Sequence, residues 1–151
     1  MAKLGEANVG GRLVPAWILN GNANGLDISE SSEYPGCFYR KLTDGTIEWF
    51  NPPMQLGKEY RTTERYLGKP MYVKIVDFGL LPANSKKVAA HGIDNLGYVL
   101  DYFGSAGYWA CPTIPHVADV QFTATNIEIT TDADLSGYAL KVVLKYFKYT
   151  D

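Results

Sequence analysis

The sequence predicts an all-β protein, on three observations. Aromatic residues make up 13% of the 151-residue chain, with 11 tyrosines, and aromatic side chains suit the half-buried surface of a pleated sheet. Short runs rich in β-branched and aromatic residues are separated by turn signals that contain glycine or proline. The last of these runs alternates apolar and mixed residues at a period of two, which is typical of a strand.

The first predicted hairpin joins residues 37–42 to residues 46–50. The dipeptide Asp44-Gly45 lies between them and tolerates the positive φ angles of a tight type I′ turn. Asn51-Pro52-Pro53 should end the second strand, because proline has no amide proton to donate to a ladder.

A second hairpin is predicted from residues 59–67 and 71–78, joined across Gly68-Lys69-Pro70. We expect Pro70 in the turn and not inside a strand. Further strands are expected at 87–90, 98–103, 120–125 and 127–131, with breaks at Gly92, Gly104, Gly107, Pro112 and Pro115. Short strands at this spacing are typical of a β-sandwich or a barrel.

The last run, residues 138–149, is the longest. Tyr138, Leu140, Val142, Leu144 and Tyr146 recur at every second position. A helix is the competing assignment, but the strict alternation and the β-branched and aromatic content favour a strand with one apolar face.

The first 33 residues differ in composition from the rest, which divides the chain into residues 1–33 and a β-domain at 34–151. Glycine and asparagine are interleaved there around one short apolar run that contains Trp17, Ile18 and Leu19. Such a segment cannot bury enough apolar surface to fold alone. It is either a loose tail or an attachment arm that docks on another subunit through these three residues.

Charge and hydropathy exclude some partners. The formal net charge is −2 and the pI about 5.7, whereas nucleic-acid-binding proteins usually carry a basic face, so no nucleic-acid partner is expected. The N-terminus has no apolar signal segment, and no run reaches the ~18 apolar residues that a membrane span requires. We expect synthesis in a cytoplasm and no membrane insertion.

Residues with catalytic or metal-binding chemistry are few. Cys37 and Cys111 are too far apart for a zinc motif and are expected as idle thiols, unless their strands are neighbours and they pair. His91 and His116 form no H-x-x-x-H pattern, and His91 is expected to make a structural hydrogen bond at a strand end. We therefore expect no catalytic residue, no metal ligand, no cofactor and no enzymatic activity.

Residues 98–110 are the most distinctive segment, because aromatic rings alternate there with small, turn-forming residues. Tyr102, Tyr108 and Trp109 are the candidate ligand-binding residues, since tyrosine and tryptophan combine apolar area with a polar edge and could stack on a sugar. The alternative is that Tyr98, Leu100 and Tyr102, as alternate residues of a strand, face the core.

Three short patterns follow one another between residues 48 and 93. They are E-x-x-x-G-K-P-x-Y-x-K at 64–74, F-G-x-L-P at 78–82 and H-G-I at 91–93. In this order they resemble a module found in the C-terminal domains of tail fibres, receptor-binding proteins and head fibres of tailed bacteriophages. The chain departs from the pattern at Val88 to His91, where two residues, Ala89 and Ala90, stand in place of one.

The resemblance implies an antiparallel, jelly-roll-like β-sandwich that forms a homotrimer. It also implies a non-enzymatic virion structural protein: a head fibre, a capsid decoration protein or a tail-fibre domain, located in the virion. Its partners would be copies of itself, other virion proteins of the capsid, portal-collar or tail, and, where it serves host adhesion, a cell-surface glycan. A chain without a stalk points to a head fibre or decoration protein whose arm grips the particle, or to a fragment. The alternative is a stand-alone carbohydrate-binding module.

Overall fold

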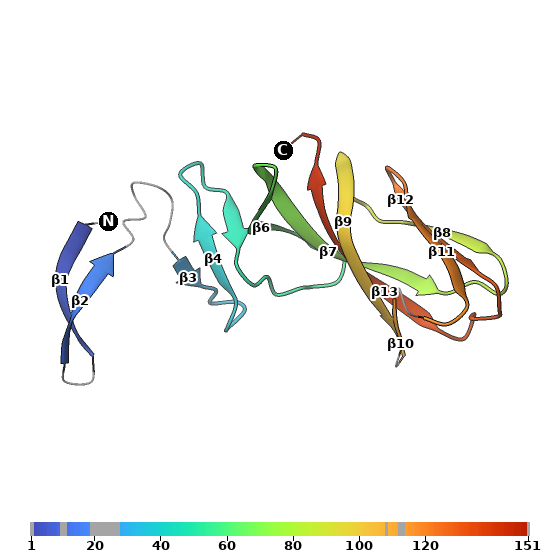
Figure 1. The fold of residues 1–151 in the computed structure, drawn as a ribbon, viewed down its shortest axis with the longest axis horizontal. Helices are drawn as coiled ribbons and strands as arrows, with labels where there is room; N and C mark the ends of the chain where they lie inside the picture. Colours follow the sequence, from blue (N-terminus) through green and yellow to red (C-terminus); the bar gives the residue numbers. More distant parts are fainter. Residues whose placement is uncertain (1, 10–11, 19–27, 108, 112–113, 151) are drawn as a thin grey trace. The chain divides into compact units, whose positions relative to one another are not determined.

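The computed structural model describes residues 2–9, 12–18, 28–107, 109–111 and 114–150, with side chains described from residue 28 on, except at 110 and 111. These residues form strands and turns and contain no helix, which confirms the all-β prediction. The chain divides into two compact units, Met1–Pro53 and Met54–Asp151 (Figure 1). The predicted boundary after residue 33 lies inside the first unit.

The first unit contains two groups of antiparallel strands. Strands β1 and β2 pair with each other, in a segment where the sequence analysis predicted no strand, and β3, β4 and β5 pair side by side in that order. The strands are β1 (Ala2–Val9), β2 (Arg12–Ile18), β3 (Ile28–Glu30), β4 (Phe38–Lys41) and β5 (Ile47–Trp49). Trp17 and Ile18 belong to β2, whereas Leu19 lies outside the described residues. The attachment role of these three residues stays a prediction.

Strands β4 and β5 confirm the first predicted hairpin, but its turn is not type I′. The Gly45 amide donates to the Leu42 carbonyl at 2.9 Å and the Leu42 amide donates to the Thr46 carbonyl at 2.8 Å. Only Gly45 has a positive φ, 89°, whereas a type I′ turn needs two such residues. The Asp44 carboxylate instead accepts the Thr46 amide at 2.8 Å, which suits a type I turn followed by one left-handed glycine.

The second unit has two layers of strands. In one layer the strands pair antiparallel in the order β10-β9-β13-β7-β6, and in the other the order is β11-β12-β8 (Figure 1). The strands are β6 (Glu59–Tyr66), β7 (Lys69–Leu80), β8 (Lys86–Ala90), β9 (Leu96–Ala106), β10 (Trp109–Cys111), β11 (Val117–Phe122), β12 (Asn126–Thr131) and β13 (Ala139–Lys148).

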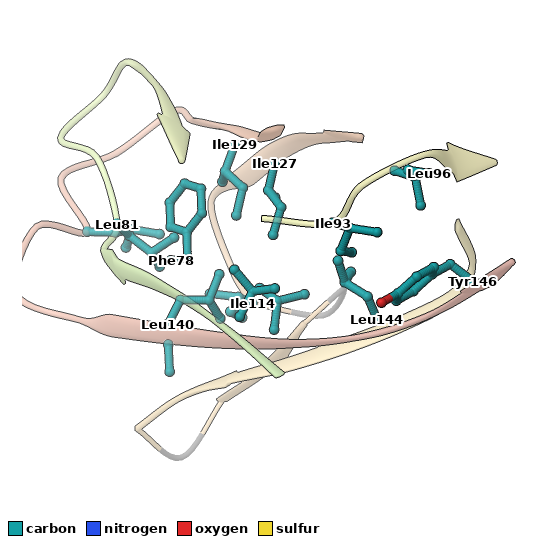
Figure 2. Close-up of a cluster of buried hydrophobic side chains, with 14 of the residues drawn as sticks. Phe78, Leu81, Ile93, Leu96, Ile114, Ile127, Ile129, Leu140, Leu144 and Tyr146 are labelled. Atoms are coloured by element: carbon teal, nitrogen blue, oxygen red, sulfur yellow. The ribbon is translucent and has the colours of Figure 1, made fainter. Parts of the chain in front are cut away.

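A hydrophobic core lies between these two layers. Figure 2 shows Ile127 and Ile129 of β12 pointing toward Leu140 and Leu144 of β13, and all four side chains are fully buried. Burying each such side chain stabilises the fold by roughly 1.5–3 kcal/mol. The other core residues include Tyr72, Val76, Phe78, Leu81, Ile93, Leu96, Ile114, Leu135, Val142 and Tyr146.

Strand β13 confirms the strand assignment of the last run and is central in its layer, between β7 and β9. Alternation along it puts Leu140, Val142, Leu144 and Tyr146 into the core, as predicted. Tyr138, which precedes the strand, stays exposed.

The second predicted hairpin is confirmed, but the position expected for Pro70 is wrong. Leu67 and Gly68 have φ angles of 49° and 80°, so these two residues form the two-residue turn, with Tyr66 paired to Lys69. Pro70 is inside β7, opposite Arg65. The pairing of β7 with β13 begins only at Met71, so no strand on that side requires a proton from residue 70.

Strand β9 is longer than predicted and irregular. It continues through Gly104, where a break was expected, to Ala106. Its pairing with β13 shifts twice, so that Val99 lies opposite Tyr146 and Leu96 opposite Lys148. As a result, the core residues in the first part of β9 are spaced by three and not by two, Leu96, Val99 and Tyr102, whereas the next one is Ala106.

Candidate ligand-binding surface

The predicted ligand residues Tyr102 and Trp109 lie in a strand-turn-strand hairpin and not in a loop. Tyr102, in β9, is half-buried against the core and packs edge-on against Phe122 at a centroid distance of 4.9 Å. Trp109, in β10, is 39% exposed and packs against Tyr138, also at 4.9 Å. Tyr108 lies outside the described residues. The two described rings therefore have different neighbours.

A larger group of rings gathers at the other end of β9. Phe147 is buried and contacts three tyrosines: Tyr66 is stacked on it at 5.4 Å, Tyr98 is tilted at 5.7 Å, and Tyr149 is edge-on at 6.3 Å. The tyrosines themselves are largely exposed, Tyr98 at 61%, Tyr149 at 58% and Tyr66 at 40%. We call these four residues the aromatic cluster.

The backbone explains why these rings meet. Phe147 follows the core residue Tyr146 in β13 and so points to the opposite face of the strand. The two register shifts in β9 turn Tyr98 toward the side of Phe147 while Val99 packs inward. The Tyr149 amide donates to the Asn95 carbonyl at 3.0 Å, which holds the end of the chain beside the start of β9.

Gly97 permits the close approach of Phe147. A Cβ atom at residue 97 would lie 2.6 Å from a Phe147 ring carbon and 2.8 Å from the Phe147 carbonyl oxygen. Both distances are shorter than any van der Waals contact, so only glycine fits beneath this ring.

A cavity of about 410 Å³ adjoins the cluster. Tyr98 and Tyr149 line it together with the first residues of β9 and the turn between β11 and β12; the lining residues are Leu96, Gly97, Tyr98, Val99, Phe122, Thr123, Ala124 and Tyr149. A second cavity, of about 280 Å³, is lined by Tyr102 and residues 117–120 of β11. Both cavities lie along β9 and β11.

Two electrostatic interactions act on the aromatic cluster. A hydrogen bond with Tyr98 raises the pKa of Tyr149, so the Tyr149 phenol stays protonated at neutral pH. The Lys69 ammonium lies over the Phe147 ring, 5.3 Å from its centroid, in a cation–π contact. The cluster therefore presents phenol hydroxyls and apolar ring faces, with one cation beside them.

A polar network lies on the core side of the same strand. The buried Tyr146 hydroxyl donates to Glu59, which also accepts Lys148 Nζ at 2.5 Å. Burial, together with this carboxylate, raises the pKa of Tyr146, so its hydroxyl remains a donor. The network gives a buried tyrosine the partner that it needs and fixes the end of β13 beneath the cluster.

His91 makes the structural hydrogen bonds predicted for it, directly after β8. Its Nδ1 accepts the Ile93 amide at 3.1 Å, which leaves Nε2 to carry the proton and donate to the Thr123 carbonyl at 3.2 Å. Burial lowers the pKa of His91, and the nearby Lys74 acts in the same direction. The imidazole is thus held neutral by its surroundings.

Metal-binding groups do not assemble in the part of the chain that the structure describes: no three His, Cys, Asp or Glu side chains lie together there. Cys37 is a half-buried free thiol, and the side chain of Cys111 lies outside the description. Among the described ion pairs, His116 contacts one carboxylate, the exposed side chain of Asp132, at 2.9 Å. No helix among the described residues is long and apolar enough to cross a membrane.

Neither Tyr66 nor Tyr149 was predicted as a ligand residue from the sequence, and Tyr98 was expected to face the core under the alternative interpretation. Strict alternation from Tyr102 would put Tyr98 on the same face. The extra residues in β9 change that phase. The available signals were Gly97, since a glycine inside a strand often marks a bulge, and the density of tyrosines near both ends of the second unit's long strands.

No family model, curated protein or solved structure matches this chain.

Proposed function

We propose that this chain is a non-enzymatic virion structural protein of a tailed bacteriophage, a head fibre, capsid decoration protein or tail-fibre domain, and that it serves adhesion through the aromatic cluster. The single observation that carries the adhesive role is the exposure of three tyrosine rings around one buried phenylalanine. The three ordered sequence patterns between residues 64 and 93 support the virion assignment.

Exposed rings in contact with one another favour a binding role. Scattered apolar residues on a surface are ordinary, whereas a contiguous aromatic group beside a cavity marks an interaction site. Tyr66, Tyr98 and Phe147 stand on paired strands, and the Tyr149 backbone is hydrogen-bonded to Asn95, so the rings are already in place before a ligand arrives.

A homotrimer suits this role. A threefold assembly would present three copies of the cluster, and repeated weak contacts to a repetitive cell surface multiply in effective affinity. The eight strands of the second unit, in two layers with antiparallel pairing, are compatible with a jelly-roll-like sandwich. Residues 1–33 would then form the arm that holds the trimer to capsid, portal-collar or tail proteins.

Two measurements test the proposal. Light scattering after size exclusion should return three times the chain mass of 16.7 kDa. Purified protein should adhere to host cells, and the double variant Tyr98→Ala/Tyr149→Ala should lose this adhesion while Trp109→Ala keeps it. A monomeric mass would contradict the trimeric assembly. Equal adhesion by the wild type and both variants would contradict a role of the aromatic cluster in adhesion.

The attachment arm needs a separate test. Deleting residues 1–33 should leave the melting temperature of the β-domain nearly unchanged and should abolish incorporation into particles. Incorporation of the truncated protein at wild-type level would contradict an attachment role.

A stand-alone carbohydrate-binding module is the second candidate, and the cavity beside Tyr98 and Tyr149 favours it. Such a module would bind its glycan as a monomer. A monomeric mass together with glycan binding would therefore select this candidate over the virion protein.

A further inference from the structure

The cavity beside the aromatic cluster has the size of a small-molecule site. Its volume, about 410 Å³, falls in the range of roughly 300–1,000 Å³ that is usual for ligand pockets. Its walls come from three places in the chain: the start of β9, Tyr149 directly after β13, and the end of β11 with the β11–β12 turn. Main-chain hydrogen bonds fix two of these walls, since β9 pairs with β13 and the Tyr149 amide donates to the Asn95 carbonyl at 3.0 Å.

The lining favours an uncharged ligand. None of the eight described residues that line the cavity is an aspartate, glutamate, lysine, arginine or histidine. A charged group would lose its hydration there without gaining a counter-charge. Lys69, the cation of the cluster, contacts the Phe147 ring and does not line the cavity.

The two tyrosines favour a ligand with one apolar face and a polar rim. Tyr98 and Tyr149 are 6.0 Å apart and inclined at 69°, so a flat ligand can stack on only one of them. The other then presents its edge and hydroxyl to the rim of that ligand. A pyranose ring has this form, with a face of C–H groups and a rim of hydroxyls, and tyrosine offers the matching apolar face and polar tip.

The main chain of β9 adds hydrogen-bonding groups. One edge of its residues 96–99 pairs with β13, whereas β10 pairs with the other edge only at residues 104–106. Within the described strands, the second edge of residues 96–99 therefore has no strand partner. Its amide and carbonyl groups can bond to ligand hydroxyls.

The second cavity extends the site along the same strands. Tyr102 lies four residues after Tyr98, at most about 13 Å along a strand. Tyr102 lines the second cavity with residues 117–120 of β11, as Tyr98 lines the first with residues 122–124. A single sugar ring is too short to reach both, whereas a linear chain of sugars can follow the seam.

We infer that the cavity beside Tyr98 and Tyr149 binds an uncharged pyranose unit of a linear glycan, whose neighbouring units follow the seam between β9 and β11 toward Tyr102. This inference rests on the proposed adhesive function and names the ligand of the same surface. It also gives Tyr102 a role at the far end of the site, although Trp109 has none.

The test uses the full chain and titration calorimetry with defined probes. The neutral probes are linear oligosaccharides of one to six units of glucose, galactose, mannose or N-acetylglucosamine, and the acidic probes carry glucuronic or sialic acid. At least one neutral series should bind, with an affinity that rises with length beyond one unit. Tyr98→Ala and Tyr149→Ala should each weaken binding by about tenfold or more, whereas Trp109→Ala, a matched exposed aromatic, should not.

Two further variants distinguish the contribution of stacking on the Tyr98 ring from that of the open volume of the cavity. Tyr98→Phe should retain most of the affinity, because the ring face remains. Ala124→Phe should abolish binding by filling the cavity while both tyrosines stay. Circular dichroism melts on every variant should agree with the wild type within a few degrees.

Several results would overturn the inference: tighter binding of acidic than of neutral probes, equal binding of one unit and of six, or loss of binding in Trp109→Ala but not in Tyr98→Ala. Cell adhesion that depends on the cluster, with no binding to any oligosaccharide, would reject the glycan and retain the adhesive function. Absence of both cell adhesion and oligosaccharide binding would reject the two together.

Discussion

Among the described residues, every buried hydrophobic side chain belongs to the second unit, whereas between residues 28 and 53 only Ser31 and Glu48 are buried. Strands β3, β4 and β5 are instead held together by polar and ring contacts. Both Arg40 Nε and Nη2 donate to Glu48, at 2.9 and 2.6 Å, and the Tyr39 and Trp49 rings lie 5.3 Å apart.

The Asn51 side chain adds two more hydrogen bonds to these strands. It accepts the Phe38 amide and donates to the Gly36 carbonyl, both at 2.6 Å. A hydrogen bond contributes about 0.5–1.5 kcal/mol net, less than the roughly 1.5–3 kcal/mol of a buried aliphatic side chain. The difference teaches that the second unit carries most of the stability and that strands β3 to β5 should open more readily.

The largest expected effect comes from the core of the second unit. Leu144→Ala removes a fully buried side chain and leaves a cavity, so the free energy of unfolding should fall by about 2–5 kcal/mol. Ile47→Ala in β5 is the matched change in the first unit, and because Ile47 is exposed it should cost less than about 1 kcal/mol. Urea denaturation of both variants checks this, and equal losses would contradict the contrast between the units.

The next effect concerns the ion pair of the first unit. Glu48→Gln leaves Arg40 without its carboxylate, and because Glu48 is fully buried strands β3 to β5 should lose about 1–3 kcal/mol of local stability. Hydrogen exchange at the β3 to β5 amides measures this loss. The control is Glu64→Gln, which breaks the exposed pair of Glu64 with Lys145 and should cost no more than about 0.5 kcal/mol.

Acid should weaken the second unit through His91. The pKa of His91 is lower in the folded chain than the ordinary value of 6.5, so the unfolded state binds more protons and stability falls as the pH drops below that value. Protonation would also remove Nδ1 as the acceptor of the Ile93 amide. Unfolding free energies measured from pH 7.5 to pH 5 should fall more for the wild type than for His91→Gln; parallel curves would exclude His91 as the cause.

The smallest expected effect is a gain in the stability of the second unit. Leu67 is 88% exposed and has a φ of 49° in the β6–β7 turn, a conformation that asparagine adopts more readily than leucine. Leu67→Asn should stabilise the second unit by about 0.5 kcal/mol. A raised melting temperature would agree with this, and Gly68→Ala, at a φ of 80°, should lower it.

Local patterns in the sequence predicted the β4–β5 hairpin and most strands of the second unit, because each depends on residues that are close in the chain, but they did not predict β1, β2, β3 or β10. The alternation in residues 138–149 and the dipeptide Asp44-Gly45 both led to the observed elements. The errors arose where the position of a residue depends on how its strand pairs with a partner strand. Pro70 is tolerated in β7 because the pairing with β13 begins one residue later, and the sequence of residues 59–78 does not contain that information.

The candidate surface was less predictable for the same reason. Tyr98, Phe147 and Tyr66 come from three strands, and their meeting depends on the register of β9 and β7 against β13. Tyr102 and Trp109 were predicted as ligand residues because aromatic rings alternate with small, turn-forming residues in 98–110, but the fold gives them different neighbours.

Gly97 has a consequence for how this surface can diversify. Any side chain at residue 97 would collide with Phe147, whereas the adjacent Tyr98 side chain is 61% exposed. In a library of all single substitutions, residue 97 should therefore tolerate no replacement, while residues 98 and 149 should accept many at little expense to folding. The surface thus combines one position that must be glycine, residue 97, with two positions that can vary, residues 98 and 149. New binding specificities can be selected at residues 98 and 149 without a change in the fold.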